Sequence, residues 1–205
     1  MRLTFLKLLI VLCVALHGLG GRVVAKQWPE PNRRLLPDAA RKAAQGAVAD
    51  ILDALARSDF KRLATHVGRE GLVLSPYVMI DADDVQLSRA EVEGCREDER
   101  VRLWGYRDGS GDAIETACRG YFAAFVWDAD YRRADEVLYN TPRQRGLEPN
   151  NNHEFAHDVI VVEMHLRGSP EGAKSYRPWK SLRLLFRHDD QGLSLIAITR
   201  DVRTI

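Results

Sequence analysis

The chain has few of the features that mark several common protein classes. Only three of its 205 residues are cysteine, too few for a disulfide-dense scaffold or a cysteine-rich zinc domain. Neither sign of charge is in excess, since 30 Lys and Arg stand against 29 Asp and Glu. This balance argues against a nucleic-acid-binding domain, which needs a basic face, and against a polybasic domain bound to a membrane surface.

The one long apolar run lies at the N-terminus. Arg2 and Lys7 form a positive region, residues 8–16 are apolar, and glycines follow before Val23-Val24-Ala25. This arrangement predicts a cleavable signal peptide over residues 1–25 and a periplasmic or secreted bacterial protein. The run is about half the length of a membrane-spanning helix, so we expect no stable membrane insertion after cleavage.

Removal of this leader changes both the charge and the cysteine count. The leader holds three basic residues and no acid, and 30 minus 3 leaves 27 basic residues against 29 acidic ones, a net charge of −2. The two remaining cysteines are Cys95 and Cys118. In an oxidising compartment they can pair, which would stabilise the fold by about 3 kcal/mol. Two separately buried thiols are the alternative, and the sequence leaves both open.

Helices are predicted in the first half of the chain. Residues 26–37 contain three prolines and predict an extended lead-in to a single domain over 38–205. Asp38 is the expected cap of a helix to about residue 57, because alanines and aliphatic residues recur there at helical spacing. A short helix over 58–66 and a strand over 71–75 follow.

Two capping-box patterns predict further helices. Ser88 and Glu91 predict a short one, and Asp112 and Glu115 predict one that continues to about Trp127. Alternating or β-branched runs predict strands over 101–106, 158–166, 181–187 and 193–199. Helices followed by antiparallel-type strands predict the α+β class.

The sharpest catalytic motif is His153-Glu154-Phe155-Ala156-His157, which matches H-E-x-x-H. In zinc peptidases the two histidines bind the metal from one helix face and the glutamate activates a water. Here three asparagines precede the motif and a strand-like run over 159–162 follows at once. A zinc-dependent hydrolase using His153, Glu154 and His157 is therefore an alternative, and the favoured interpretation has no metal or other cofactor.

Charged residues inside predicted strands are the remaining chemical signal. No G-x-S-x-G or phosphate-binding loop is present. Arg183 lies in the middle of one strand, and Glu163 and His165 share a face of another. They either line a pocket that binds an anion or moves a proton, or lie on the solvated face of a one-sided sheet. The sequence favours the solvated face.

Short motifs run in order through residues 50–205. They are Leu74-Ser-Pro-Tyr77, Trp104-Gly105 with Asp108-Gly-Ser-Gly111, Tyr121 with Phe125, Asp128-x-Asp130-Tyr131, Val137-Leu-Tyr-Asn140, Ser181-Leu-Arg-Leu184 and Asp201-x-x-Thr204-Ile205. On these the chain resembles an uncharacterised family of secreted bacterial proteins. Its element order resembles the NTF2-like (cystatin-like α+β) fold, a long N-terminal helix packed on a curved, mainly antiparallel sheet. Arg200 and Arg203 stand where the resemblance implies a histidine and an aromatic residue.

The resemblance implies a fold and an exported location, and no catalytic residue. The sequence therefore favours a non-catalytic module that binds a small ligand or interacts with a protein. The candidate pocket residues are Tyr77, Trp104, Tyr121, Tyr139, Arg183 and Asp201. Aromatic walls with one arginine suit a small anionic or planar ligand, although core packing is the ordinary role of each aromatic side chain.

Two further possibilities stay open at this stage. Besides the zinc-dependent hydrolase, the chain can be a cavity enzyme of isomerase or dehydratase type, with His165 or Asp201 as the base. The partner can be a small molecule, another protein or a second copy of the chain in a homodimer. Nucleic acid is not expected.

Overall fold

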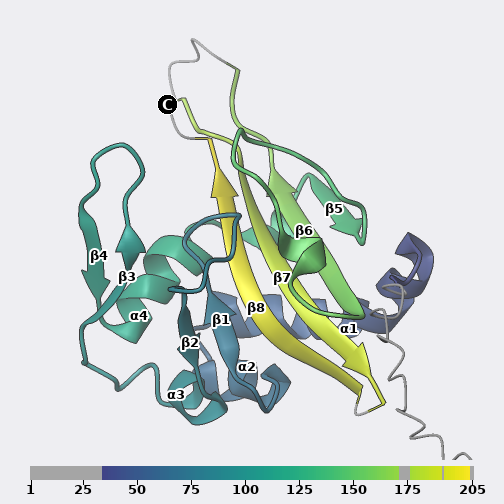
Figure 1. Cartoon of the computed structure of the whole chain (residues 1–205), viewed down its shortest axis with the longest axis horizontal. Helices are drawn as coiled ribbons and strands as arrows, with labels where there is room; N and C mark the ends of the chain where they lie inside the picture. Colours follow the sequence, from purple (N-terminus) through teal and green to yellow (C-terminus); the bar gives the residue numbers. More distant parts are fainter. Residues whose placement is uncertain (1–33, 171–175, 191, 204–205) are drawn as a thin grey trace, which may run out of the picture. The chain divides into compact units, whose positions relative to one another are not determined.

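The structure is a computed structural model that describes residues 34–170, 176–190 and 192–203. The predicted signal peptide over 1–25 lies outside the described residues, as does most of the lead-in over 26–37. The rest folds as α+β, with a long helix first and the longest strands last (Figure 1). No helix in the described part is both long and apolar enough to span a bilayer.

Helix α1 (Pro37–Ala56) supplies one face of the core. Pro37 occupies its first position, where the missing N–H costs nothing, so Asp38 lies in the first turn and is not the cap that the sequence predicted. The second helix, α2 (Phe60–His66), follows directly, and the side chain of Asp59 caps it by accepting a hydrogen bond from the Arg62 N–H. The side chains that α1 buries are Ala40, Ala44, Val48, Ile51, Leu52, Ala54 and Leu55, most of them at helical spacing.

Six strands form the main sheet in the order β2-β1-β8-β7-β6-β5. Their bounds are Leu72–Leu74 for β1, Val85–Leu87 for β2, Glu136–Tyr139 for β5, Val159–Leu166 for β6, Lys180–Asp189 for β7 and Gly192–Val202 for β8. All neighbouring pairs are antiparallel except β1 and β8, which run parallel. This helix on a curved, mostly antiparallel sheet confirms the predicted fold class.

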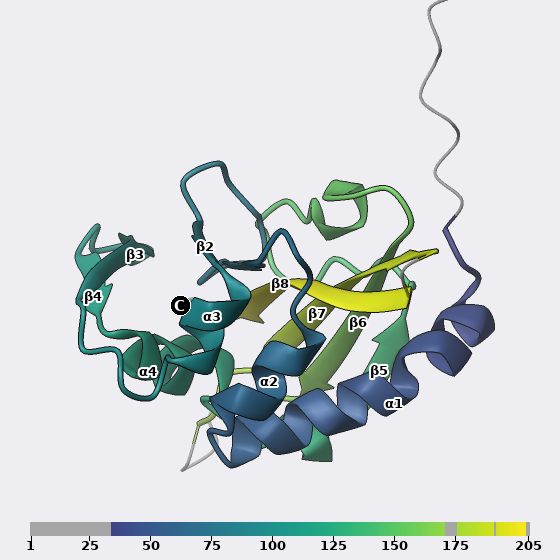
Figure 2. The same cartoon turned by 90° about the horizontal axis from the view of Figure 1, so that it is seen from below.

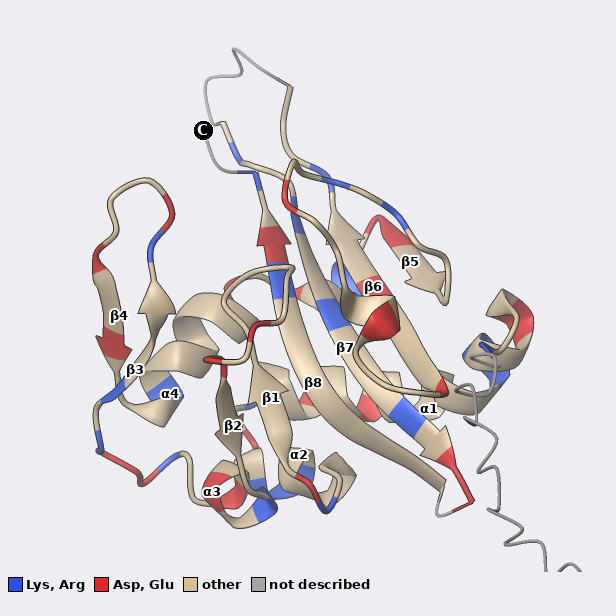
Figure 3. Ribbon diagram, in the orientation of Figure 1, with Lys and Arg blue, Asp and Glu red and all other residues tan. Residues whose placement is uncertain are grey.

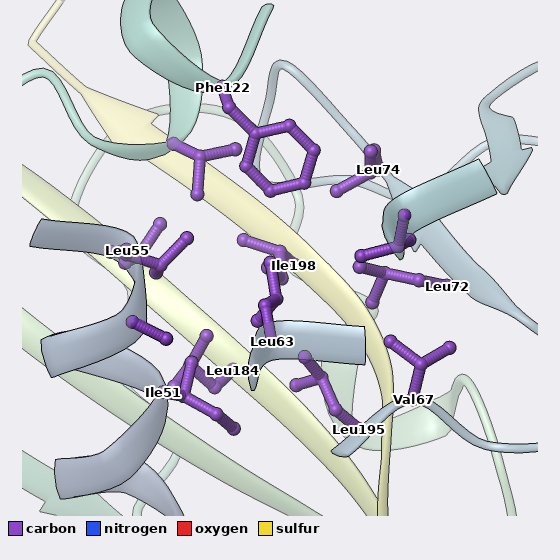
Figure 4. Packing of buried hydrophobic residues seen from close by; sticks show 14 of the residues in the cluster. Ile51, Leu55, Leu63, Val67, Leu72, Leu74, Phe122, Leu184, Leu195 and Ile198 are labelled. Atoms are coloured by element: carbon purple, nitrogen blue, oxygen red, sulfur yellow. The ribbon is translucent and has the colours of Figure 1, made fainter. Parts of the chain in front are cut away.

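The two faces of the sheet are covered by different parts of the chain. Helices α1 and α2 lie on one face, and the segment between β5 and β6 crosses the other (Figure 2). The helix side holds the large apolar core, in which Ile51 and Leu55 of α1 meet Leu184 of β7 and Ile198 of β8 (Figure 4). Leu182, Leu184 and Phe186 share this face, as the alternation in the sequence predicted.

The segment between residues 112 and 127 differs from its prediction. Instead of starting a helix at Asp112, residues Ala113–Thr116 form β4, which pairs with β3 (Arg102–Tyr106) in a separate two-stranded sheet. The helical part begins only at α4 (Cys118–Tyr121) and continues as a π-helix over Phe122–Val126. The hairpin prevails because pairing with β3 satisfies the backbone of β4 while its Ile114 is buried.

The other capping box is confirmed. Ser88 accepts a hydrogen bond from the Glu91 backbone N–H, and the Glu91 side chain accepts one from the Ser88 N–H, at the start of α3 (Arg89–Glu93). Cys95, just after this helix, forms a disulfide with Cys118 at the start of α4. Of the two states that the sequence left open, the structure therefore has the paired one.

Candidate functional site

The sheet face turned away from α1 carries two rows of buried polar side chains. Neighbouring strands place Glu163, Arg183 and Thr199 in one row, and His165, Ser181 and Asp201 in the next. We call these six residues the polar face. In Figure 3, basic bands interrupt β7, and basic and acidic bands lie near the C-terminal end of β8, in the sheet that carries the polar face.

The polar face is not solvated, so the interpretation favoured by the sequence was wrong. All six of its side chains belong to buried residues, with exposed fractions of 8% or less. The covering layer is the segment between β5 and β6. From it, Asn152 accepts a hydrogen bond from Thr199 at 2.9 Å and donates one to the Val78 carbonyl at 2.6 Å.

Glu163 is the centre of the network on this face. Its Oε1 accepts hydrogen bonds from Ser181 Oγ at 2.7 Å, from Arg145 Nε at 2.9 Å and from Arg183 Nη2 at 3.2 Å. Arg183 Nη2 also donates to Asp201 at 3.2 Å. Burial raises the pKa of Asp201, and the neighbouring Arg183 opposes that rise. Buried charges of opposite sign thus hold the three central strands and the covering segment together.

His165 lies at the edge of this network. Its Nδ1 is 2.9 Å from Ser181 Oγ, and its ring centroid is 5.9 Å from that of Trp179. Burial lowers the pKa of His165, and the Arg145 guanidinium lowers it further, against the carboxylates of Glu163 and Glu136. The imidazole is therefore neutral at neutral pH.

A cleft opens beside His165, and three arginines line it. Its volume is about 470 Å³. Its lining consists of Arg143, Gln144, Arg145, His165, Arg167, Gly168 and Trp179. We call it the arginine cleft. None of the described residues that line it is acidic, so its walls present positive charge and hydrogen-bond donors.

Two of these arginines are oriented by carboxylates that do not themselves line the cleft. Arg145 donates from Nη2 to Glu136 and from Nε to Glu163, and Arg143 forms an ion pair with Glu136 at 3.4 Å. Arg167 is exposed, and its guanidinium has no ion-pair partner within residues 34–170, 176–190 and 192–203. The cleft therefore combines two positioned guanidiniums with one that is available to a ligand.

A second cleft of about 480 Å³ adjoins the first, with Arg145 and Trp179 in both walls. Tyr77, Arg200 and Asp201 are also among its lining residues. The Tyr77 hydroxyl donates to the Tyr106 carbonyl and accepts from the Asp108 N–H at 2.8 Å, which fixes the side chain between the main sheet and the hairpin.

The predicted pocket residues fall into two groups. Tyr77 and Asp201 line the second cleft, and Arg183 is bonded to Asp201. The other three are buried on the helix side: Trp104 and Tyr121 stack at 4.1 Å, and Tyr139 lies beneath the Arg41 guanidinium at 5.1 Å. The structure therefore brings together the polar half of the predicted set and packs its remaining aromatic residues in the core.

Apart from His165, the sequence did not single out the residues that line the arginine cleft. Arg143, Arg145 and Arg167 lie just outside strands, in segments without helical or strand periodicity, and Trp179 precedes β7. The only available signal was the Arg143-x-Arg145 spacing, which is common on solvated surfaces. Their convergence depends on the way the segment after β5 folds back over β6.

The H-E-x-x-H segment does not form the helix that a zinc site requires. Only a 3-10 turn over Asn152–Glu154 is present, and β6 starts at Val159. His153 is buried, with no hydrogen-bond partner for Nδ1, while His157 is exposed. Among the described residues, no three His, Cys, Asp or Glu side chains gather where they could hold a metal ion. The geometry gives the zinc-hydrolase alternative no support.

His153 makes the stability of the fold depend on pH. Burial, with Arg34 and Arg183 nearby, lowers its pKa from 6.5 to about 4. The unfolded chain then binds the proton more readily than the folded one, so stability is lost as the pH falls from 6.5 to 4. We expect His153→Gln to reduce that loss by about 3 kcal/mol, measured by urea unfolding at pH 7 and pH 4. The exposed His157→Gln variant should keep the wild-type loss, and equal losses in all three proteins would contradict the assignment.

No protein-family model and no curated protein matches the chain. Among solved structures, the chain is similar to an NTF2-like protein with a cystatin-like fold from Novosphingobium aromaticivorans, with 12% identity, 80% of this chain and 81% of that chain covered, and a TM-score of 0.35. It is also similar to a candidate dehydratase from the NTF2-like family of Streptomyces avermitilis. The identity is 15%, 82% of this chain and 100% of that chain are covered, and the TM-score is 0.32.

A third similar structure is a candidate calcium/calmodulin-dependent protein kinase II association domain from Xanthomonas campestris, with 14% identity, 84% of this chain and 95% of that chain covered, and a TM-score of 0.35. At these identities and TM-scores, the similarities support neither a family nor a function for this chain. The described residues themselves form a long helix on a curved, mostly antiparallel sheet.

Proposed function

We propose that the protein is an exported binding module that takes a small anionic ligand in the arginine cleft. Export is inferred from the leader over residues 1–25. The observation that carries the binding proposal is a cleft with three arginines and a tryptophan in its walls and no acidic side chain among its described lining residues. Arginine guanidiniums recognise carboxylates and phosphates by paired, charge-assisted hydrogen bonds.

The buried network supports this proposal because it positions donors before a ligand arrives. Arg145 is tied to Glu136 and Glu163 through Nη2 and Nε. Its Nη1 has no hydrogen-bond partner within the described residues, and Arg145 lines both clefts. A donor that is already oriented loses less conformational entropy when it binds. Arg145 is therefore an already oriented donor for a ligand oxygen that carries negative charge.

The size of the cleft and its aromatic wall favour a planar organic anion. A volume of about 470 Å³ lies within the range of small-molecule sites. Trp179 offers a ring against which a flat ligand can stack, worth about 1 kcal/mol beyond simple burial. A carboxylate attached to a flat group, such as an aromatic or conjugated acid, combines both contacts.

Titration with simple anions tests the proposal. We expect benzoate to bind with a Kd on the order of 1 mM, as two charge-assisted hydrogen bonds and one stacking contact allow. Acetate, which cannot stack, should bind about 5- to 10-fold more weakly. Arg167→Gln should weaken benzoate binding by about 10-fold, because this arginine has no other ion-pair partner in the described chain. Calorimetry measures each affinity directly.

Arg69→Gln is the matched control, since Arg69 is an exposed arginine that does not line the cleft. It should leave the affinity unchanged. Trp179→Phe keeps a ring in the wall and should retain most of the binding, whereas Trp179→Ala should abolish the preference for benzoate over acetate. Equal weakening by Arg69→Gln and Arg167→Gln would show non-specific charge attraction and would refute the site.

A further inference from the structure

We propose that His165 is a catalytic residue of the arginine cleft, whose Nε2 atom accepts a proton from the bound anion. Ser181 and Glu163 act as positioning residues. The inference rests on the proposed function, because the arginines must hold the ligand beside the imidazole. With this role for His165, the protein is an acid–base enzyme that acts on small oxo acids. Such an enzyme belongs to the isomerase or dehydratase class that the sequence left open.

The hydrogen bonds on the polar face determine which ring nitrogen carries the proton. Glu163 contacts two guanidiniums and is a carboxylate, which can only accept hydrogen bonds. The single Ser181 hydroxyl proton is donated to Glu163 at 2.7 Å. The Ser181 oxygen must then accept from His165, whose Nδ1 lies 2.9 Å away. The proton of the neutral imidazole is thereby fixed on Nδ1.

This tautomer leaves the lone pair on Nε2, the nitrogen that the network does not use. His165 lines the arginine cleft, so Nε2 is the ring atom available to a ligand there. Burial keeps the imidazole neutral by lowering its pKa, and a neutral imidazole with an accessible lone pair is the form that acts as a general base. Arg145, in the wall of the same cleft, supplies a positive charge opposite to that of a bound anion.

These groups fit one elementary step. Arg167 and Arg143 hold the carboxylate of an oxo acid, and Nε2 removes a proton from the carbon next to its carbonyl. The C–H bond breaks, an N–H bond forms, and the electron pair becomes an enolate whose oxygen Arg145 stabilises. If the acid carries a β,γ double bond, return of the proton to its γ-carbon moves the double bond and isomerises the acid. Expulsion of a β-hydroxyl group, which takes the same proton, releases water, and neither outcome needs a cofactor.

The first test uses iodoacetate on the full exported protein, followed by peptide mapping. The His165 lone pair should displace iodide and give a carboxymethyl group on Nε2. Because the arginines attract the anionic reagent, we expect iodoacetate to modify His165 at least 10-fold faster than neutral iodoacetamide does. The exposed His157 and His188 provide internal references. Equal rates for the two reagents at His165, or no modification there, would overturn the inference.

The second test measures catalysis itself. Pyruvate, 2-oxobutyrate and acetoacetate are incubated with the protein in D2O, and loss of the C–H signals next to the carbonyl is followed by NMR. We expect exchange of at least one acid to slow by about 100-fold or more in His165→Asn. Asparagine keeps a donor for Ser181 but lacks Nε2. Exchange by the wild type that equals exchange in His165→Asn would refute the catalytic role.

A third variant separates positioning from structure. In Ser181→Ala the proton is no longer fixed on Nδ1, so iodoacetate should modify both ring nitrogens of His165, a change that a merely structural role would not produce. Benzoate binding is measured on every variant. Binding without alkylation or exchange refutes the catalytic inference and leaves the proposed function in place. If the wild type does not bind benzoate, both the catalytic inference and the proposed function are refuted.

Discussion

Replacement of Arg183 with methionine is expected to lower the free energy of unfolding by about 3–5 kcal/mol. Arg183 is 1% exposed and donates to both Glu163 and Asp201. Methionine fills a similar volume but leaves Asp201 buried without its counter-charge and removes one of the two guanidiniums from Glu163. The cost of uncompensated buried charge is far larger than the net strength of the pair itself. Urea unfolding at pH 7 measures the loss.

Arg187 of the same strand provides the matched control. It pairs with Glu70 at 2.8 Å, but both side chains are substantially exposed, so Arg187→Met should cost less than about 1 kcal/mol. In a Glu163→Gln background, Arg183→Met should lower the free energy of unfolding by less than it does in the wild type, because a neutral amide no longer needs the guanidinium. A loss of less than 1 kcal/mol for Arg183→Met alone would show that the polar face is open to water.

Loss of the disulfide is expected to lower the free energy of unfolding by about 3 kcal/mol. Cys95 and Cys118 are separated by 23 residues, and a loop of that size restricts the unfolded chain by roughly this amount. For a domain of this length the melting temperature should fall by roughly 6–12 °C. The Cys95→Ala, Cys118→Ala double variant and the chemically reduced wild type should show the same loss, measured by thermal unfolding.

The disulfide also links two helical segments that are separated in sequence by the β3–β4 hairpin. It links the end of α3 to the start of α4, where the chain leaves the β3–β4 hairpin. Single replacement of either cysteine should cost as much as the double replacement, since each one removes the same bond. Free thiols in the native protein, with no effect of a reductant on melting, would contradict the pairing.

Elements with a strong local pattern could be predicted from the sequence. Helix α1 and strand β7 follow apolar spacings of 3.6 and 2 residues, and Ser88 with Glu91 marks α3 by capping chemistry. Asp112 and Glu115 have the same capping pattern, yet β4 forms there, because pairing with β3 depends on residues that are distant in sequence. The parallel pairing of β1 with β8 was missed for the same reason.

The site was only partly predictable. Alternation in the sequence placed Glu163 and His165 on one strand face, and Arg183 inside a neighbouring strand, but it could not show what covers them. The covering segment between β5 and β6 has no periodic pattern, so neither the burial of the polar face nor the convergence of Arg143 and Arg167 could be derived. Aromatic residues such as Trp104 and Tyr121 gave a stronger signal in the sequence, and they belong to the core.

NMR titration with sodium benzoate tests most directly whether the arginine cleft is an anion site. Backbone and side-chain ¹⁵N–¹H signals of the protein are followed, with sodium chloride at equal ionic strength as the reference. The structure predicts saturable shifts confined to residues 143–148 and 165–168 and to the Trp179 indole. Shifts spread over the surface arginines, or none that saturate, would contradict the existence of an anion site in this cleft.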